Sequence, residues 1–205
     1  MPEDRVMSNA ALRILLEAVE EVMGKNGTHA ILNASKLSQY IDNYPEKNDE
    51  MGTTFGEYGL VEQSIEDFYG PRGARAMMLR IGRATFQYGI NEQPAALGLV
   101  GVALKAIPEK RRMKMILEKM ASAAGEILNQ PSHVVEEEDA YYYIQDECPC
   151  HWRPPHDKPC CYVTVGALTE AMAWTTGKVF KVEEMACISN GATNCVYRVP
   201  KEAQE

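Results

Sequence analysis

The sequence predicts an α+β fold in which a helical N-terminal part packs on a small antiparallel sheet. Apolar residues recur at helical spacing through the first two-thirds of the 205-residue chain. The last third contains short segments rich in Val and Tyr, which are typical of strands. The predicted order there is strand, strand, helix, strand, strand. We expect the whole chain, 1–205, to form a single domain.

The first predicted helix follows Ser8, which is a suitable N-cap, and is expected to end near Gly24 and Gly27. A short second helix is expected over 30–41, followed by a polar loop over 46–56. These first segments, 1–56, form a possible helical extension of the domain. The apolar face of the first helix comprises Leu12, Leu15, Leu16, Val19, Val22 and Met23.

Three further helices are expected in the middle of the chain. The helical pattern over 58–69 is broken at Gly70-Pro71 and resumes over 72–88. Residues 95–106 are apolar on nearly all sides and predict a buried helix. Pro108 suits the first turn of a last long helix. The apolar face of that helix comprises Met113, Ile116, Met120, Ala124 and Ile127.

The sheet and the metal-binding part are predicted within 132–200. An Asn-Gly pair at Asn190-Gly191 is a strong signal for a hairpin between the last two strands. The expected elements are strands within 133–145, a helix over 161–177, and strands over 179–188 and 194–199.

The charge of the chain restricts its partners. The formal net charge is −8, and both nucleic acids and anionic membranes select basic surfaces, so neither is expected as the main partner. We also find no export signal and no apolar run long enough to span a bilayer. A cytoplasmic location is the default expectation.

All six cysteines lie between Cys148 and Cys195. Without an export signal, clustered cysteines indicate a metal site more often than disulfides. A helix that packs on a hairpin can bring Cys161 in its first turn close to Glu184, Cys187 and Cys195. Three thiolates and one carboxylate suit tetrahedral zinc, and four protein ligands leave no open position, so such a site would be structural.

Strand geometry sets one condition on this ligand set. On a regular strand, Glu184 and Cys187 point to opposite faces. Both can bind one metal only if the strand has a bulge or a turn near Met185 or Ala186. The alternative is that the cysteines are buried thiols and that Glu184 is a solvated strand residue.

The C-terminal pattern resembles that of the 4-vinyl reductase (4VR) domain family. The matching residues are Cys161 with Gly166, Glu184-Met-Ala-Cys187, Gly191 and Cys195. The family includes archaeal hydrocarbon-binding proteins, a bacteriochlorophyll-biosynthesis protein and the sensor domains of phenol-responsive transcription activators. The resemblance is specific over 161–199 and weaker over 79–86 and 107–112.

This resemblance implies a fold, a ligand set and an oligomeric state. In the phenol sensors a zinc is held by three cysteines and one glutamate, with the same spacing as here. The family fold resembles the ligand-binding domain shared with heme-nitric-oxide sensors and TRAPP transport-particle subunits. Family members are usually dimeric, which implies a homodimer for this chain. We expect the first hundred residues to form much of the interface.

This chain also has chemistry that the family pattern lacks. Cys148, Cys150 and Cys160 lie just upstream of Cys161, together with His151 and His156. They form a second metal site, compete with Cys161 for the first, or are thiols in a proline-stiffened loop.

The helical part is the expected place for a ligand pocket. Methionine is adaptable and suits pockets that take apolar ligands, and Trp adds a polar tip. For most of these positions, plain core packing is the alternative. The candidates are Met77, Met78, Ile81, Phe86, Leu97, Met113, Met120, Trp152 and Trp174.

The sequence favours a binding domain over an enzyme. No G-x-G-x-x-G, G-x-x-x-x-G-K or G-x-S-x-G motif is present. We therefore expect a zinc-containing domain that takes a hydrophobic or tetrapyrrole-like ligand. One alternative is an enzyme or accessory in vinyl reduction of a chlorophyll precursor, and another is an assembly module without a ligand.

Overall fold

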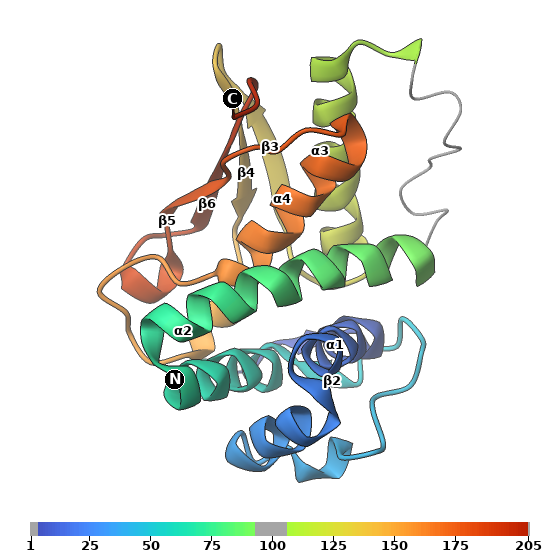
Figure 1. Ribbon diagram of the computed structural model, residues 1–205, viewed down its shortest axis with the longest axis vertical. Coiled ribbons are helices and arrows are strands. Elements are labelled where there is room, and N and C mark those ends of the chain that lie inside the picture. Colours follow the sequence, from blue (N-terminus) through green and yellow to red (C-terminus); the bar gives the residue numbers. More distant parts are fainter. Residues whose placement is uncertain (1–3, 93–105, 205) are drawn as a thin grey trace.

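The computed structural model describes residues 4–92 and 106–204. The predicted α+β fold is confirmed: helices pack on one side of a four-stranded antiparallel sheet (Figure 1). The helix predicted over 95–106 lies outside the described residues apart from its last one. No helix within the described ranges combines the length and apolar character needed to cross a bilayer.

Helix α1 (Asn9–Ala34) begins at the predicted N-cap, where the Ser8 hydroxyl accepts a hydrogen bond from the Ala11 amide at 3.3 Å. Gly24 interrupts it with a φ of 73°, but the helix then continues to Ala34. The predicted separate helix over 30–41 is wrong in its bounds. Ile31 and Leu32 are fully buried, and their packing keeps the chain helical beyond the glycine kink.

Helix α2 (Phe55–Glu92) is also kinked, at Gly70, where φ is 66° and Pro71 follows. The predicted break at Gly70-Pro71 is therefore confirmed, and the two halves of α2 match the predicted helices. The loop predicted over 46–56 includes a strand that the sequence analysis missed. There β2 (Thr53–Thr54) pairs antiparallel with β1 (Val6–Met7).

Helix α3 (Glu109–Glu126) follows Pro108, as predicted, and packs on the sheet through Met113 and Ile116. The sheet has the order β3-β4-β6-β5, and every neighbouring pair is antiparallel. Its strands are β3 (Ser132–Glu136), β4 (Ala140–Gln145), β5 (Glu183–Ala186) and β6 (Cys195–Pro200).

The predicted Asn-Gly hairpin turn is only partly correct. Gly191 has the positive φ, 96°, that this prediction requires. The strands are nevertheless joined by a longer connection that contains the short 3₁₀ helix η4 (Ile188–Asn190). This longer connection leaves Cys187 and Cys195 on the inner side of the sheet's end, where both are fully buried.

Helix α4 (Tyr162–Thr176) lies between the sheet and α2 (Figure 1). It crosses α2 at two glycines that allow the backbones to touch. A Cβ on Gly82 would lie 2.0 Å from the Val163 carbonyl oxygen, and one on Gly166 would lie 2.3 Å from that of Leu79. The crossing joins a core between α1 and α2 to a second core between α3, α4 and the sheet.

Candidate metal centre and adjoining cavity

The structure brings all six cysteines into one buried cluster, which we call the thiol cluster. Each of them is at most 3% exposed. They come from three places: the 3₁₀ helix η3 (Pro149–Trp152) and the residue before it, the residues that precede α4, and the ends of β5 and β6. The members are Cys148, Cys150, Cys160, Cys161, Cys187 and Cys195.

The sulfur atoms of the cluster are in contact with one another. Cys161 Sγ lies 3.6 Å from that of Cys148, 3.7 Å from that of Cys187 and 3.9 Å from that of Cys195. Cys150 Sγ lies 3.5 Å from that of Cys195 and 3.7 Å from that of Cys187. Thiolates are soft metal ligands, so this cluster concentrates soft donors at one place.

Glu184 reaches this cluster because β5 is irregular. The register of β5 against β6 shifts between Glu184 and Ala186, which confirms the bulge predicted near Met185 or Ala186. Glu184 Oε2 accepts a hydrogen bond from the Cys161 amide at 2.8 Å. Its other oxygen, Oε1, is buried without a hydrogen-bond partner. A buried, unpaired carboxylate oxygen beside thiols suits a bound cation.

Two overlapping groups of side chains have their ligand atoms within 4.8 Å of one another. One group is the predicted set of Cys161, Glu184, Cys187 and Cys195. The other consists of Cys148, Cys150, Cys161 and Cys195. Cys161 and Cys195 belong to both groups.

At Glu184 and Cys161 the surroundings disfavour negative charge unless a cation is bound. Burial, together with the charge of Cys187, raises the pKa of Glu184 to about 9. Hydrogen bonding with the neighbouring thiols, Cys148 first, and burial raise the pKa of Cys161 well above its ordinary value. A divalent cation reverses this preference, because it stabilises thiolates and carboxylates directly. The donor set therefore fits a bound metal.

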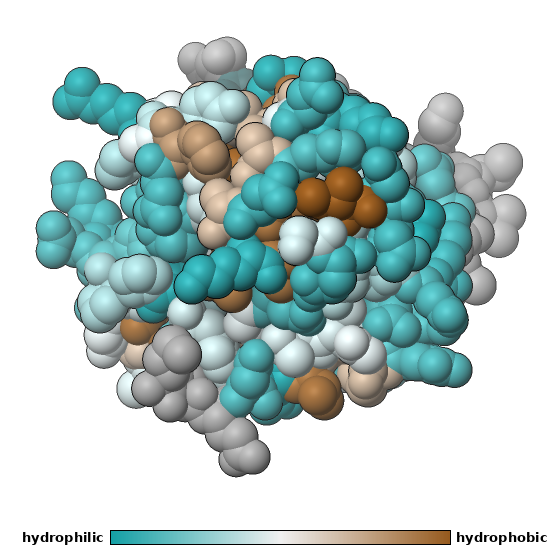
Figure 2. Space-filling model, turned by 90° about the horizontal axis from the view of Figure 1, so that it is seen from below, coloured by the Kyte–Doolittle hydropathy of each residue, from teal (hydrophilic) through white to brown (hydrophobic). Residues whose placement is uncertain are grey.

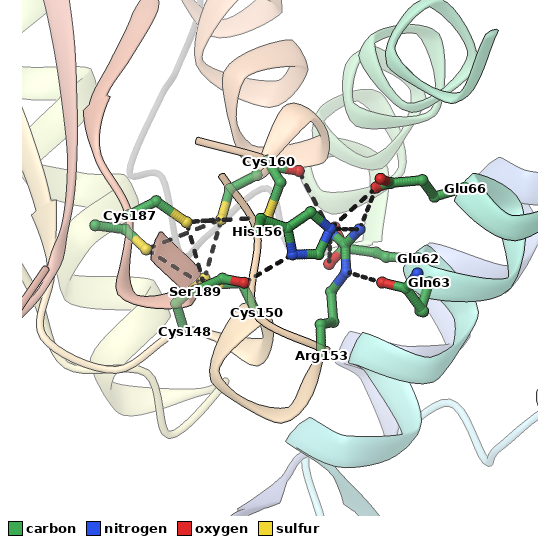
Figure 3. A network of polar contacts seen from close by, with 12 residues as sticks. Glu62, Gln63, Glu66, Cys148, Cys150, Arg153, His156, Cys160, Cys187 and Ser189 are labelled. Carbon is green, nitrogen blue, oxygen red and sulfur yellow. Dashed lines mark hydrogen bonds and ion pairs between the residues drawn. The ribbon is translucent and has the colours of Figure 1, made fainter. Parts of the chain in front are cut away.

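Neither histidine of the loop joins the cluster. His151 is exposed, and its ring packs beside Trp152 with centroids 5.2 Å apart. His156 Nδ1 lies 2.8 Å from the Ser189 hydroxyl, and its Nε2 lies 3.3 Å from Glu66. Figure 3 shows His156 beside the cysteines but pointing toward Arg153.

Arg153 forms a buried ion-pair network next to the thiol cluster (Figure 3). Its fully buried guanidinium lies 2.6 Å from Glu66 and 3.7 Å from Glu62, and it donates to the Cys160 carbonyl at 3.3 Å. The network ties the cysteine loop to α2. The sequence did not lead us to predict this network. The signals that could have indicated it are an arginine within a cysteine-rich loop and two glutamates one helical turn apart.

A cavity of about 220 Å³ lies beside the thiol cluster, between the helices and the sheet. Cys148 and Cys161 form part of its wall, with Tyr58 and Glu62 nearby. Small side chains on three helices leave this space open. They are Ala10 and Ala11 of α1, Ala123 and Ala124 of α3, and Ala167 of α4.

The structure places two of the predicted pocket residues, Phe86 and Met120, on the cavity wall. Met78 and Ile81 lie instead in the core between α1 and α2, and Met77 packs against that core. Of the remaining candidates, three pack against other side chains and one lies outside the described residues. Met113 lies in the core next to the sheet, Trp152 packs on Phe55, Trp174 is 38% exposed against the edge of Phe86, and Leu97 is outside the described residues.

Most of the methionines predicted to line the pocket lie in the cores instead, because long flexible side chains fill space, whereas a cavity forms where side chains are short. The alanines that recur on facing helices were the sequence signal from which the cavity wall could have been predicted.

No protein-family model matches the sequence, and no curated protein sequence matches it either. Solved structures do show similarity. The Fe(II) unliganded H-NOX protein from K. algicida is 12% identical, with 97% of this chain and 98% of that chain covered and a TM-score of 0.62. An oxygen-binding H-NOX domain related to soluble guanylate cyclases is also 12% identical, with coverages of 97% and 99% and a TM-score of 0.60.

The phenol-responsive sensory domain of the transcription activator PoxR, with phenol, is a further similar structure. It is 14% identical, 71% of this chain and 73% of that chain are covered, and the TM-score is 0.52. At these identities the similarity concerns the fold. The chain therefore has the fold that H-NOX domains and this phenol-sensing domain share.

Proposed function

We propose that this protein binds a small, largely apolar molecule in the cavity, and that a zinc ion beside the cavity holds its wall in place. The observation that supports this most directly is the position of Cys148 and Cys161, which belong both to the cavity wall and to the thiol cluster. Occupancy of the cavity and occupancy of the metal site are then physically coupled. The cavity wall moves if Cys161 loses its metal.

In this proposal Cys161, Glu184, Cys187 and Cys195 hold the zinc. The ligands join the start of α4 to β5 and β6, so the ion crosslinks the helix to the sheet. Four protein ligands complete a tetrahedron, and the ion therefore contributes folding free energy rather than an open coordination position. The buried, unpaired Glu184 Oε1 supports the carboxylate as the fourth ligand.

The size of the cavity restricts the ligand. Its 220 Å³ lies below the roughly 300–1,000 Å³ of pockets for drug-sized molecules, which favours a small ring or short chain over a tetrapyrrole. The wall is mainly apolar, and Tyr58, Thr85 and Gln130 add a few polar groups. A phenol-sized molecule with one polar substituent matches this lining.

The metal part of the proposal is tested by removing the metal. Chelation under reducing conditions should lower the melting temperature by several degrees, because a structural zinc contributes on the order of 10 kcal/mol in small isolated domains and a share of that here. Cys187→Ser should have the same effect, whereas Met185→Ala, at an exposed position two residues away, should not. A metal-free protein with an unchanged melting temperature would contradict the structural role.

The ligand part is tested by filling the cavity. Ala123→Leu places a larger side chain on the cavity wall, whereas Ser122→Leu changes an exposed position of the same helix. A panel of phenols and small aromatic hydrocarbons, followed by calorimetry, should give binding that Ala123→Leu weakens at least tenfold and Ser122→Leu leaves unchanged. Equal binding by both variants, or binding of heme alone, would refute this pocket assignment.

A further inference from the structure

We propose that the thiol cluster holds two zinc ions that share Cys161 and Cys195 as bridging thiolates. One ion takes Cys161, Glu184, Cys187 and Cys195, and the other takes Cys148, Cys150, Cys161 and Cys195. The inference rests on the proposed zinc site and extends it. The two groups of four ligand atoms, each within 4.8 Å of one another, overlap in these two cysteines.

The sulfur separations within each group match two tetrahedra that share an edge, whereas Cys150 and Cys187, 3.7 Å apart in different groups, must move apart when both ions bind. A Zn–S bond of about 2.3 Å in a tetrahedral site separates neighbouring sulfurs by about 3.8 Å. In the first group, the Sγ atoms of Cys161 and Cys187 are 3.7 Å apart. In the second, the Cys148–Cys161 and Cys150–Cys195 separations are 3.6 and 3.5 Å. The shared edge, from Cys161 to Cys195, measures 3.9 Å.

A single ion leaves soft donors unused. One tetrahedral zinc in the first group leaves the thiols of Cys148 and Cys150, 3% and 0% exposed, pressed against coordinated sulfur. A second ion uses both thiols, each of which loses its proton to solvent as its S–Zn bond forms. It also compensates negative charge, since five thiolates and one carboxylate far exceed the charge of one divalent cation in a buried site.

The sixth thiol provides a natural control. Cys160 is buried and adjacent to the bridging Cys161, but it belongs to neither group. Its sulfur lies 3.9 Å from that of Cys187. It is therefore equal to the proposed ligands in burial and chemistry and differs from them only in position.

The proposed second ion is also the one nearer the cavity. Two of its ligands, Cys148 and Cys161, lie on the cavity wall, whereas Glu184 and Cys187 do not. A small molecule in the cavity would thus lie against Cys148 and Cys161, which form one edge of the second ion's coordination tetrahedron.

Native mass spectrometry and elemental analysis of the full chain test the inference directly. We expect two zinc ions per chain. Cys148→Ser and Cys150→Ser should each reduce this to one, Cys160→Ser should leave two, and Cys161→Ser, at a bridge, should reduce the content by more than one. Cobalt substitution of the unaltered chain should give two equivalents of thiolate-bound Co²⁺ by absorption titration.

The outcomes separate this inference from the proposed function. One zinc in the unaltered chain would leave the single zinc site standing and overturn the shared centre. Independent sites would be indicated if Cys161→Ser lost only one of two ions, which would overturn the bridges. Iron with acid-labile sulfide, or no metal at all, would overturn both proposals. The metal count of the unaltered chain decides even where a variant fails to fold.

Discussion

Glu62 is buried beside the Arg153 guanidinium. This ion pair only partly offsets the free-energy cost of removing the carboxylate from water. Glu62 is 4% exposed and lies 3.7 Å from Arg153. Burial raises its pKa to about 8, although the Arg153 guanidinium opposes this shift. Arg153 makes its shorter ion pair, 2.6 Å, with Glu66. The guanidinium is thus shared between two carboxylates, and burial favours the protonated form of Glu62.

This shift predicts a pH dependence of stability. The folded state keeps the Glu62 proton up to about pH 8, whereas the unfolded chain loses it near the ordinary value of 4.5. The folded state therefore binds more protons in this window, and the free energy of unfolding falls as pH rises from about 4.5 to 8. The loss attributable to Glu62 is on the order of a few kcal/mol.

Glu62→Gln should flatten this dependence, which urea unfolding at a series of pH values between 5 and 8.5 would show. Asp67→Asn, at an exposed position of the same helix, serves as the control and should keep the slope of the unaltered protein. Equal slopes for all three proteins would mean that Glu62 is ionised in the fold.

At the scale of single residues, the chemistry of the site was easier to predict than its shape. Cysteines are rare, and their spacing, with the alternation of strand residues, led to Glu184 and to the bulge that the register confirms. The cavity depends on absent side-chain volume, as at Ala123 and Ala167, and no single residue type announces it. Cys148 and Cys150 belong to the same cluster because of the course that their loop takes in space. Local sequence patterns do not determine that course, so their membership could not be predicted.

Among the elements, the crossing of α2 and α4 sets the distance between the two cores. Gly82 and Gly166 face each other there, and a Cβ on Gly166 would lie 3.0 Å from the Gly82 Cα. Helix backbones approach this closely only where side chains are missing. The same crossing positions Cys161, the N-cap of α4, five residues before Gly166.

We therefore predict that Gly166→Ala lowers the free energy of unfolding by at least about 1–3 kcal/mol, the usual cost of overpacking a core. Its clash is with backbone, 2.3 Å from the Leu79 carbonyl oxygen, and backbone cannot rotate away. Gly125→Ala in α3 is the control, because nothing lies within 4 Å of its Cβ position. There alanine should be neutral or stabilising by up to about 1 kcal/mol. Thermal unfolding of both variants checks the prediction, and a stable Gly166→Ala protein would contradict the described contact.

The helix bounds show which local signals the tertiary structure overrides. Gly70-Pro71 breaks α2 as its sequence indicates, since proline removes a backbone donor and glycine accepts the positive φ. Gly24 has the same conformation, yet α1 resumes after it because Ile31 and Leu32 are buried against α2. The short β1–β2 ribbon is held by contacts between distant segments and has no strand-like pattern of its own.

For the whole molecule, a homodimer remains a prediction. The face viewed in Figure 2 is largely hydrophilic, with separated apolar patches. On α2, Leu60, Phe68 and Tyr69 are 44%, 58% and 47% exposed. Apolar side chains that are exposed in one copy become buried in a symmetric pair. We expect light scattering to show a dimer at micromolar concentration.

Phe68→Glu should weaken this dimer at least tenfold, whereas Val179→Glu, equally exposed but outside the helical part, should not. A monomer in the unaltered protein would refute the prediction, and an effect of Val179→Glu alone would move the interface to the sheet side.

The distribution of the thiol cluster along the chain also orders the folding reaction. Cys148 and Cys195 are separated by α4 and β5, so the cluster cannot close until β6 has paired with β4. Closing such a long loop is entropically costly and comes late. The helices α1 and α2 have their own core and no part in the cluster, so they can form without metal. We therefore expect metal capture to follow the pairing of β6 with β4, late in folding.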